Sequence, residues 1–156
     1  MRPVTPEEVW SVYQASIGAD AQSSSLSYRT RRFSDQPAET DALCALVLSG
    51  TKRATAPCLW QFVDEPVPVP GDLHVVIDSR GLACCVIRTT RVQIVPFRNV
   101  PLDFVRLEGE GDGGIEHWRR VHWSYYQRVL APLGREPTDD MPVVCQDFEV
   151  VHRVGD

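Results

Sequence analysis

The order of helix-like and strand-like segments is the feature that most restricts the folds open to this chain. Helix-like segments come first, strand-like segments fill the middle, and further helix-like segments precede a last strand. The patterns predict helices at about residues 5–17, 37–48, 101–107 and 115–130, and strands at about 73–78, 82–90, 92–97 and 143–151. Because helices and strands do not alternate regularly, we predict an α+β fold rather than a doubly wound parallel sheet.

Local signals mark the ends of two helices. In Thr5-Pro6-Glu7-Glu8, a capping threonine is followed by a proline at the first helical position and by a glutamate three residues after the cap. Gly50 follows the second helix and is a natural C-terminal stop. The segment that begins at residue 51 is therefore expected to leave a helix and enter a strand, with its small side chains facing a cleft.

Size and composition are those of a small soluble protein. At 156 residues and 17.5 kDa, the chain is long enough for one domain with its own core, so we expect a single domain over residues 1–156. No apolar stretch is long enough to span a bilayer, and residues 1–5 lack the apolar centre of a signal peptide. We therefore expect a cytoplasmic protein that does not enter the membrane.

The cysteines and histidines do not have the spacing of a metal site or a disulfide framework. The five cysteines are odd in number and contain no C-x-x-C pair, and the four histidines show neither an H-x-H nor an H-E-x-x-H pattern. We expect no metal and no other cofactor.

The net charge of −5 argues against broad, non-specific binding to nucleic acid. Arginines nevertheless gather in two places. Such a basic face could hold a phosphate or a short RNA; the alternative is that these arginines are solvated and that nearby acidic side chains balance their charge. These arginines are Arg29, Arg31 and Arg32, and then Arg88, Arg91 and Arg98.

One lysine stands among the sixteen basic side chains, and it is Lys52. An arginine keeps its proton in a protein, whereas a desolvated lysine can lose its proton and act as a base. The single lysine is therefore a candidate for chemistry, although an arginine-rich composition that leaves one lysine behind is an equal alternative on composition alone.

Six motifs in a fixed order give the chain a resemblance to a known family. They are Leu46-Val47-Leu48-Ser49-Gly50-Thr51-Lys52-Arg53-Ala54-Thr55, Pro70-Gly71-Asp72, Val95-Pro96-Phe97, Glu108-Gly109-Glu110-Gly111-Asp112, Trp118-Arg119 with His122, and Asp147-Phe148-Glu149-Val150-Val151. The chain resembles the ASCH family of PUA-like domains, and it is most similar to the longer bacterial branch. The resemblance covers about residues 33–151, which we take as the core of the domain.

The resemblance implies a PUA-like fold, a small mixed or antiparallel β-barrel flanked by helices, with a cleft lined by the G-x-K-x-x-T segment. Some small members of the family are amidohydrolases that remove the acetyl group from N4-acetylcytidine, a longer member is associated with ribonuclease activity, and others are RNA-binding modules. The implied partner is a nucleoside or a short single-stranded RNA. A monomer and a homodimer both remain open, and the family predicts fold better than reaction.

The family's catalytic lysine and threonine correspond to Lys52 and Thr55, and its glutamate lies in the acidic segment. Both Glu108 and Glu110 fit, and we favour Glu110. The arginine that is common two places after the threonine in small amidohydrolases is Pro57 here, which weakens transfer of the exact substrate.

These residues suggest a hydrolytic site. A threonine hydroxyl needs a base, and Lys52 would supply one if burial lowers its pKa. Glu110 would orient a water or protonate a leaving amine. The alternatives that involve no catalysis are a threonine present because β-branched residues suit strands, and glutamates that lie in a solvated loop.

Three further residues are candidates for substrate binding. Arg53 lies beside the lysine, Trp60 would stack on a base, and His122 would face the cleft. A core tryptophan and an interior histidine with a satisfied partner are the alternatives. The sequence thus predicts a small hydrolase for a modified nucleoside or RNA, with a ribonuclease or a non-catalytic RNA-binding module as alternatives.

Overall fold

The computed structural model describes residues 2–18, 26–111 and 114–156. The chain forms two compact units. The first unit contains Met1–Gly50, Gly71–Thr89 and Glu149–Asp156, and the second contains Thr51–Pro70 and Thr90–Phe148. Residues 19–25, which follow the first predicted helix, lie outside the described residues.

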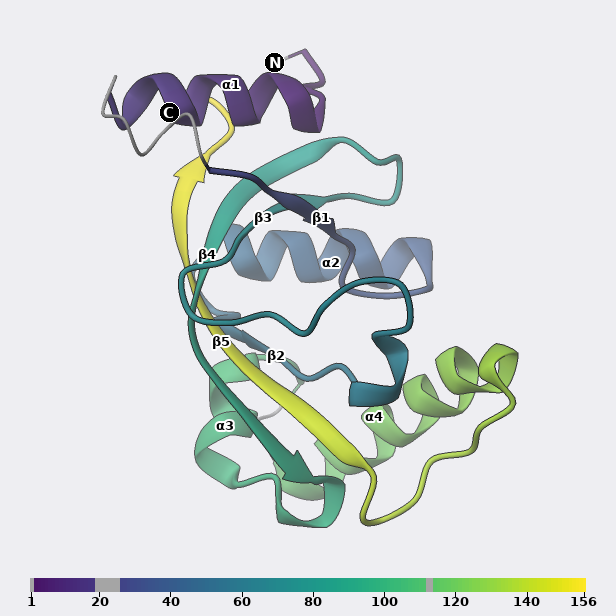
Figure 1. Cartoon of the computed structure of the whole chain (residues 1–156). Helices are drawn as coiled ribbons and strands as arrows, with labels where there is room; N and C mark the ends of the chain where they lie inside the picture. Colours follow the sequence, from purple (N-terminus) through teal and green to yellow (C-terminus); the bar gives the residue numbers. More distant parts are fainter. Residues whose placement is uncertain (1, 19–25, 112–113) are drawn as a thin grey trace. The chain divides into compact units, whose positions relative to one another are not determined.

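The described residues form four α-helices and five strands, which are labelled in Figure 1. The helices are α1 (Pro6–Ser16), α2 (Pro37–Leu48), α3 (Leu102–Glu108) and α4 (Ile115–Leu130). The strands are β1 (Arg29–Arg31), β2 (Ala54–Thr55), β3 (Leu73–Ile77), β4 (Ala83–Pro96) and β5 (Pro142–Arg153). Short 3-10 turns lie at Leu59–Gln61, Phe97–Asn99 and Ala131–Leu133.

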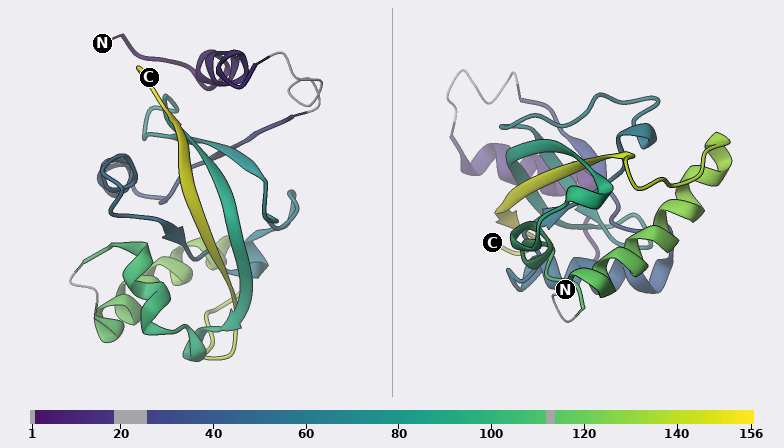
Figure 2. Two further views of the ribbon diagram at one scale, coloured as in Figure 1. Left: turned by 90° about the vertical axis from the view of Figure 1, so that its left-hand side faces the viewer. Right: turned by 90° about the horizontal axis from the view of Figure 1, so that it is seen from below.

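The five strands form one mixed sheet in the order β1-β3-β4-β5-β2. Strand β1 is parallel to β3, whereas the pairs β3–β4 and β2–β5 are antiparallel. The long strands β4 and β5 run side by side (Figure 2). The predicted α+β class is confirmed. In the described part of the chain the two outer strands do not pair with each other, so the sheet is open rather than the closed barrel that was expected.

The first unit has a core between α1 and the sheet. Val9, Trp10 and Tyr13 of α1 pack with apolar residues of β3 and β4. The predicted capping box is present, because the Thr5 side chain accepts from the backbone of Glu8 and the Glu8 side chain accepts from the backbone of Thr5. This helix therefore starts where local sequence predicts.

The second unit has a core of its own, to which α3, α4 and β5 contribute. The buried residues of α4 are Trp118, His122, Tyr126 and Leu130, each four positions after the last. This spacing places one continuous stripe on the inner face of the helix. The stripe brings a histidine and a tryptophan to the same buried place.

Three differences from the sequence prediction matter for the site. Strand β4 continues without the expected break at residue 91, and β2 is only a two-residue strand. Helix α3 extends to Glu108, so this residue ends a helix instead of beginning a loop. Of the acidic segment 108–114, residues 112 and 113 lie outside the described part.

None of the helices in the described residues is long and apolar enough to cross a membrane.

Candidate functional site

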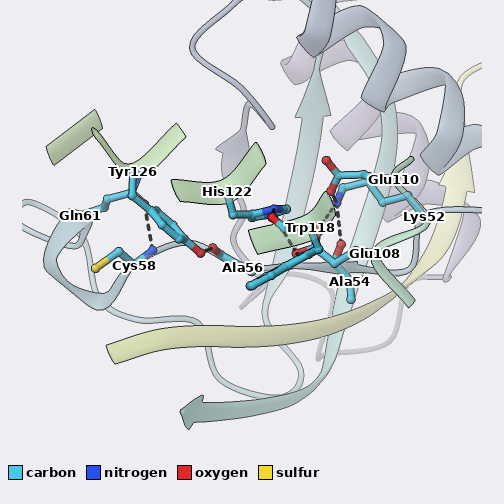
Figure 3. Close-up of polar contacts among 10 residues, drawn as sticks. All are labelled: Lys52, Ala54, Ala56, Cys58, Gln61, Glu108, Glu110, Trp118, His122 and Tyr126. Carbon is cyan, nitrogen blue, oxygen red and sulfur yellow. Dashed lines mark hydrogen bonds and ion pairs between the residues drawn. The ribbon is translucent and has the colours of Figure 1, made fainter. Parts of the chain in front are cut away.

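The amine of Lys52 is buried in the second unit, where it meets three oxygen acceptors (Figure 3). The residue is 1% exposed. Its Nζ donates to the backbone oxygen of Ala54 at 2.7 Å, to Glu108 Oε2 at 2.8 Å and to Glu110 Oε2 at 2.7 Å. An ammonium carries three N–H donors and no acceptor, so each proton has a partner. The geometry is that of a protonated lysine.

The approach of α3 to the lysine segment depends on Gly109. This residue has φ +66, and a Cβ built on it would lie 2.3 Å from the backbone oxygen of Thr51. The backbone N–H of Arg53 donates to the oxygen of Leu107 at 2.7 Å, which holds the two segments together. A glycine between Glu108 and Glu110 therefore lets both carboxylates reach the same ammonium.

The carboxylate of Glu108 is enclosed by donors. The residue is 1% exposed, and its second oxygen accepts from the indole N–H of Trp118 and meets His122 Nε2, both at 3.2 Å. Burial by itself would raise the pKa of Glu108. The charges of Lys52 and then of His122 outweigh burial, so the pKa lies well below its usual range. Glu108 is therefore a fixed negative charge.

Both ring nitrogens of His122 face acceptors. Nδ1 lies 3.0 Å from the backbone oxygen of Trp118, which can only accept, and Nε2 faces the Glu108 carboxylate. Burial would lower the pKa of His122, but the Glu108 charge and hydrogen bond raise it overall. The rings of His122 and Trp118 stack with centroids 4.2 Å apart. These contacts fit an imidazolium, whose positive charge lies against an aromatic face.

Lys52 has a raised pKa, contrary to the prediction that burial would make it a base. Burial does act to lower the pKa, but the charges of Glu108 and Glu110 and their hydrogen bonds outweigh it. The prediction considered desolvation without the two carboxylates. Lys52 is thus a permanent cation in this site and cannot take a proton from Thr55.

Glu110 is the titratable member of the cluster. Burial, and then repulsion from the charged Glu108, raise its pKa to about 7, although Lys52 acts in the opposite direction. Its side chain is 18% exposed, whereas those of Lys52 and Glu108 are 1% exposed. The carboxyl group that changes its charge near neutral pH is therefore the one that solvent reaches.

Glu108, Glu110 and His122 also have the composition of a metal site. One donor atom from each lies within 4.8 Å of the others in the described part of the chain. Lys52 Nζ bonds both carboxylates, however, and already supplies the positive charge that a metal would bring. A metal ion would have to displace the lysine, so the donor set as folded fits an ammonium better. The absence of a metal remains a prediction.

The other predicted site residues do not join this cluster. Thr55 lies in β2 opposite Gln146 and is partly exposed. Within the described residues, no hydrogen bond connects its hydroxyl to Lys52. Arg53 is exposed beside the cluster, and one face of the Trp60 ring is covered by the guanidinium of Arg135, 4.5 Å from the ring centroid. Trp60 therefore offers less stacking surface than expected.

Sequence reasoning missed the donor roles of α4. Trp118 entered the sequence analysis only as part of a motif, yet its indole N–H donates to the catalytic candidate Glu108. Tyr126, one turn beyond His122, donates to the backbone oxygen of Ala56 at 2.6 Å and so anchors the segment that follows β2. The spacing Trp118, His122, Tyr126 was the available signal, because buried indole and phenol groups need polar partners.

Comparison with known proteins gives these features a family context. Residues 29–152 match the family model for the ASCH domain. A solved ASCH domain from Lactobacillus crispatus JV V101 is 28% identical, with a TM-score of 0.86 and coverage of 94% of each chain. A solved protein from Enterococcus faecalis V583 is 27% identical, with a TM-score of 0.78 and coverage of 96% of this chain and 91% of that chain. None of the curated proteins compared with this chain matches it.

Proposed function

Because this chain belongs to the ASCH domain family, we propose that it is a small hydrolase of modified nucleosides, with Glu110 as its general acid–base. The observation that carries the proposal is the Glu110 carboxyl group, which solvent reaches and whose pKa is about 7. A group with this pKa can accept and return a proton at neutral pH with nearly equal ease. The family resemblance supplies the substrate class, an N4-acylated cytidine.

The proposed reaction is hydrolysis of the exocyclic amide. Ionised Glu110 takes a proton from a water molecule while the water oxygen bonds to the acyl carbon. The protonated Glu110 then gives this proton to the cytosine amine as the carbon–nitrogen bond breaks. The products are a carboxylic acid and cytidine, and Glu110 returns to its ionised state. No separate base is needed, since one carboxyl group performs both transfers.

The remaining charged groups hold Glu110 in place and set its pKa. Lys52 fixes one oxygen of Glu110 and one of Glu108, and Trp118 and His122 hold the other oxygen of Glu108. This arrangement keeps Glu108 ionised next to Glu110. Thr55 remains in the proposal through the family resemblance, as a hydroxyl that contacts the substrate and not as a nucleophile activated by Lys52.

A small ligand suits the charge of the chain better than a long RNA. The net charge is −5, so little general attraction for a polyanion is available. Arg53 is exposed next to the lysine in sequence and is the cation best placed to contact a ribose or a single phosphate. We therefore propose a free nucleoside or a short single strand as the partner.

The direct test is incubation with N4-acetylcytidine and, separately, with single-stranded RNA, followed by chromatography of the products. We expect cytidine and acetate from the first and intact RNA from the second. Glu110→Gln should lower turnover by on the order of a hundredfold or more. Glu136→Gln, which changes an exposed glutamate elsewhere in the second unit, is the matched control and should be normal. Cleaved RNA would support a ribonuclease, and binding without product would support an RNA-binding module.

The rate should also follow the ionisation of Glu110. Because the ionised carboxylate starts the reaction, kcat/KM should rise about tenfold per pH unit below pH 7 and level off above it. The measurement is a pH profile of N4-acetylcytidine hydrolysis. A profile that is flat from pH 5 to 8 in an active protein would remove Glu110 from the role of base.

A further inference from the structure

A β-bulge interrupts the regular pairing of β3 and β4 beside two neighbouring cysteines, Cys84 and Cys85. Val76 pairs with Cys85, and the next residue, Ile77, pairs with Ala83. Cys84 is thus the extra residue of β4 that has no partner in the ladder. Such a residue alters the direction in which the side chains around it point.

The packing of the residues that flank the two cysteines shows this change of direction. Ala83 and Val86 both belong to the apolar cluster that α1 forms with the sheet. Residues three apart in a regular strand point to opposite faces, so the bulge must have reset the alternation. Cys84 directly follows Ala83, and Cys85 directly precedes Val86, so each cysteine is adjacent in sequence to a residue that faces α1. Cys84 and Cys85 are therefore turned toward the opposite face of the sheet.

Cys44, from helix α2, meets Cys84 at this bulge. The Cys44 thiol lies 3.4 Å from the backbone oxygen of Ile77, the residue opposite the bulge. The Cys84 thiol is also the neighbour that acts most strongly on the pKa of Cys44, and Cys44 acts most strongly on the pKa of Cys84. Two thiols that are forty positions apart in sequence are therefore neighbours at the bulge within the first unit.

The two thiols differ in exposure and in acidity. All five cysteines lie in the described residues, and Cys84 is partly exposed while the other four are buried. The interaction with Cys44 lowers the pKa of Cys84, whereas the same interaction and burial raise the pKa of Cys44. Burial raises the pKa of the neighbouring Cys85 to about 12. Cys84 therefore has the accessible and more readily ionised sulfur.

We propose that Cys84 and Cys44 are a peroxide-reactive thiol pair, in which Cys84 is the attacking sulfur and Cys44 the resolving one. In the first step the Cys84 thiolate bonds to one oxygen of a hydroperoxide and the O–O bond breaks. The leaving oxygen takes the proton that Cys84 released and departs as water or an alcohol, which leaves a sulfenic acid. In the second step the Cys44 sulfur bonds to the Cys84 sulfur and the S–O bond breaks.

The departing hydroxide takes the Cys44 proton and forms a second water. The two thiols together lose two electrons and two protons, and one hydroperoxide accepts them. The site is independent of the Lys52 cluster, so its test needs no hydrolytic substrate.

Peptide mapping after brief exposure of the native protein to hydrogen peroxide tests the proposal. Trypsin places Cys44 in the peptide Phe33–Lys52 and Cys84 in Gly81–Arg88. We expect these two peptides joined by a disulfide that a thiol reductant reverses. The joined pair should form in Cys85→Ser and be lost in Cys84→Ser, which makes Cys85→Ser the matched control.

A second measurement examines the resolving role of Cys44. In Cys44→Ser the Cys84 sulfenic acid has no partner, so a dimedone-type reagent should label Cys84 more strongly than in the wild type. The proposal is overturned if the wild type shows no joined peptides when its Cys84 is oxidised, or if the bond forms through Cys85 instead. Absence of any oxidation at Cys84 under conditions that oxidise free glutathione would overturn it as well.

Discussion

At the scale of the residue, position 52 requires a lysine because of the geometry of the ammonium group. The ammonium is a compact cation with three donors that point in different directions, whereas the guanidinium of arginine is a flat fork. The three acceptors of Lys52 come from Ala54, Glu108 and Glu110, and the side chain is buried. An arginine would keep the charge but would not reproduce these three contacts in the same volume. The lone lysine is thus explained by geometry instead of by basicity.

The unusual pKa of Glu110 predicts a measurable effect on stability. A carboxyl group whose folded pKa of about 7 exceeds its usual value of 4.5 favours the folded state when protonated, so its contribution is lost as pH rises from 4.5 through 7. Glu110→Gln cannot ionise and should raise the free energy of unfolding at pH 8 by on the order of 3 kcal/mol. Urea unfolding measures this, and the gain should vanish at pH 4. A variant that is destabilised equally at both values would contradict the raised pKa.

At the scale of the element, one glycine decides whether α3 can deliver its carboxylates. Gly109 ends the helix in the left-handed conformation, and its α-carbon faces the backbone of Thr51. The contact joins the end of a helix to a segment more than fifty positions earlier. Because backbone cannot move aside as a side chain can, only a residue without a Cβ fits there.

Gly109→Ala should therefore be far more damaging than an alanine at a similar helix end. Gly134 is the matched control, because it has φ +70 but a Cβ there would meet nothing within 4 Å. We expect Gly134→Ala to cost about 1 kcal/mol, from backbone strain alone, and Gly109→Ala to cost several times more. Thermal unfolding of both variants gives the comparison. Equal losses would show that the approach to Thr51 does not constrain the fold.

At the scale of the whole molecule, buried ionisable groups in the two units respond to acid in opposite directions. His74 in the first unit is 1% exposed, and neither ring nitrogen has a hydrogen-bond partner among the described residues. Burial, with help from Arg31 and Arg29, lowers its pKa to about 3. A neutral His74 thus stabilises the fold above pH 6.5, and this contribution is lost as pH falls toward 3. Glu110 has the opposite effect between pH 4.5 and 7.

Replacing His74 should therefore change the pH dependence of stability. A folded pKa of about 3 means that the wild type loses about 2 kcal/mol from this group between pH 7 and pH 5. His74→Leu removes that loss and also removes a buried polar side chain without a partner, so it should be more stable, most clearly at pH 5. Urea unfolding of both proteins at the two pH values measures the difference. Parallel losses in the two proteins would mean that His74 is not the responsible group.

The sequence by itself determined the elements whose signals are local. The predicted helices at about 37–48 and 115–130 have the same bounds as α2 and α4, because the apolar spacing that predicts them acts within one helix. The family followed from the motifs, and the α+β class from the order of the helices and strands. Strand β1 was missed and β2 was expected only as a strand of unstated length, since a two- or three-residue strand exists only through the neighbour with which it pairs.

Only the tertiary structure decided the charges of the site. The sequence singled out Lys52, Glu108, Glu110 and His122, but it predicted a neutral lysine acting on Thr55. The ionisation of Lys52 depends on Glu108, which lies 56 positions away in sequence and 2.8 Å away in space. Desolvation and charge pairing act on a buried lysine with opposite signs. Which of them prevails is set by partners that folding brings together, and no local pattern in the sequence contains that information.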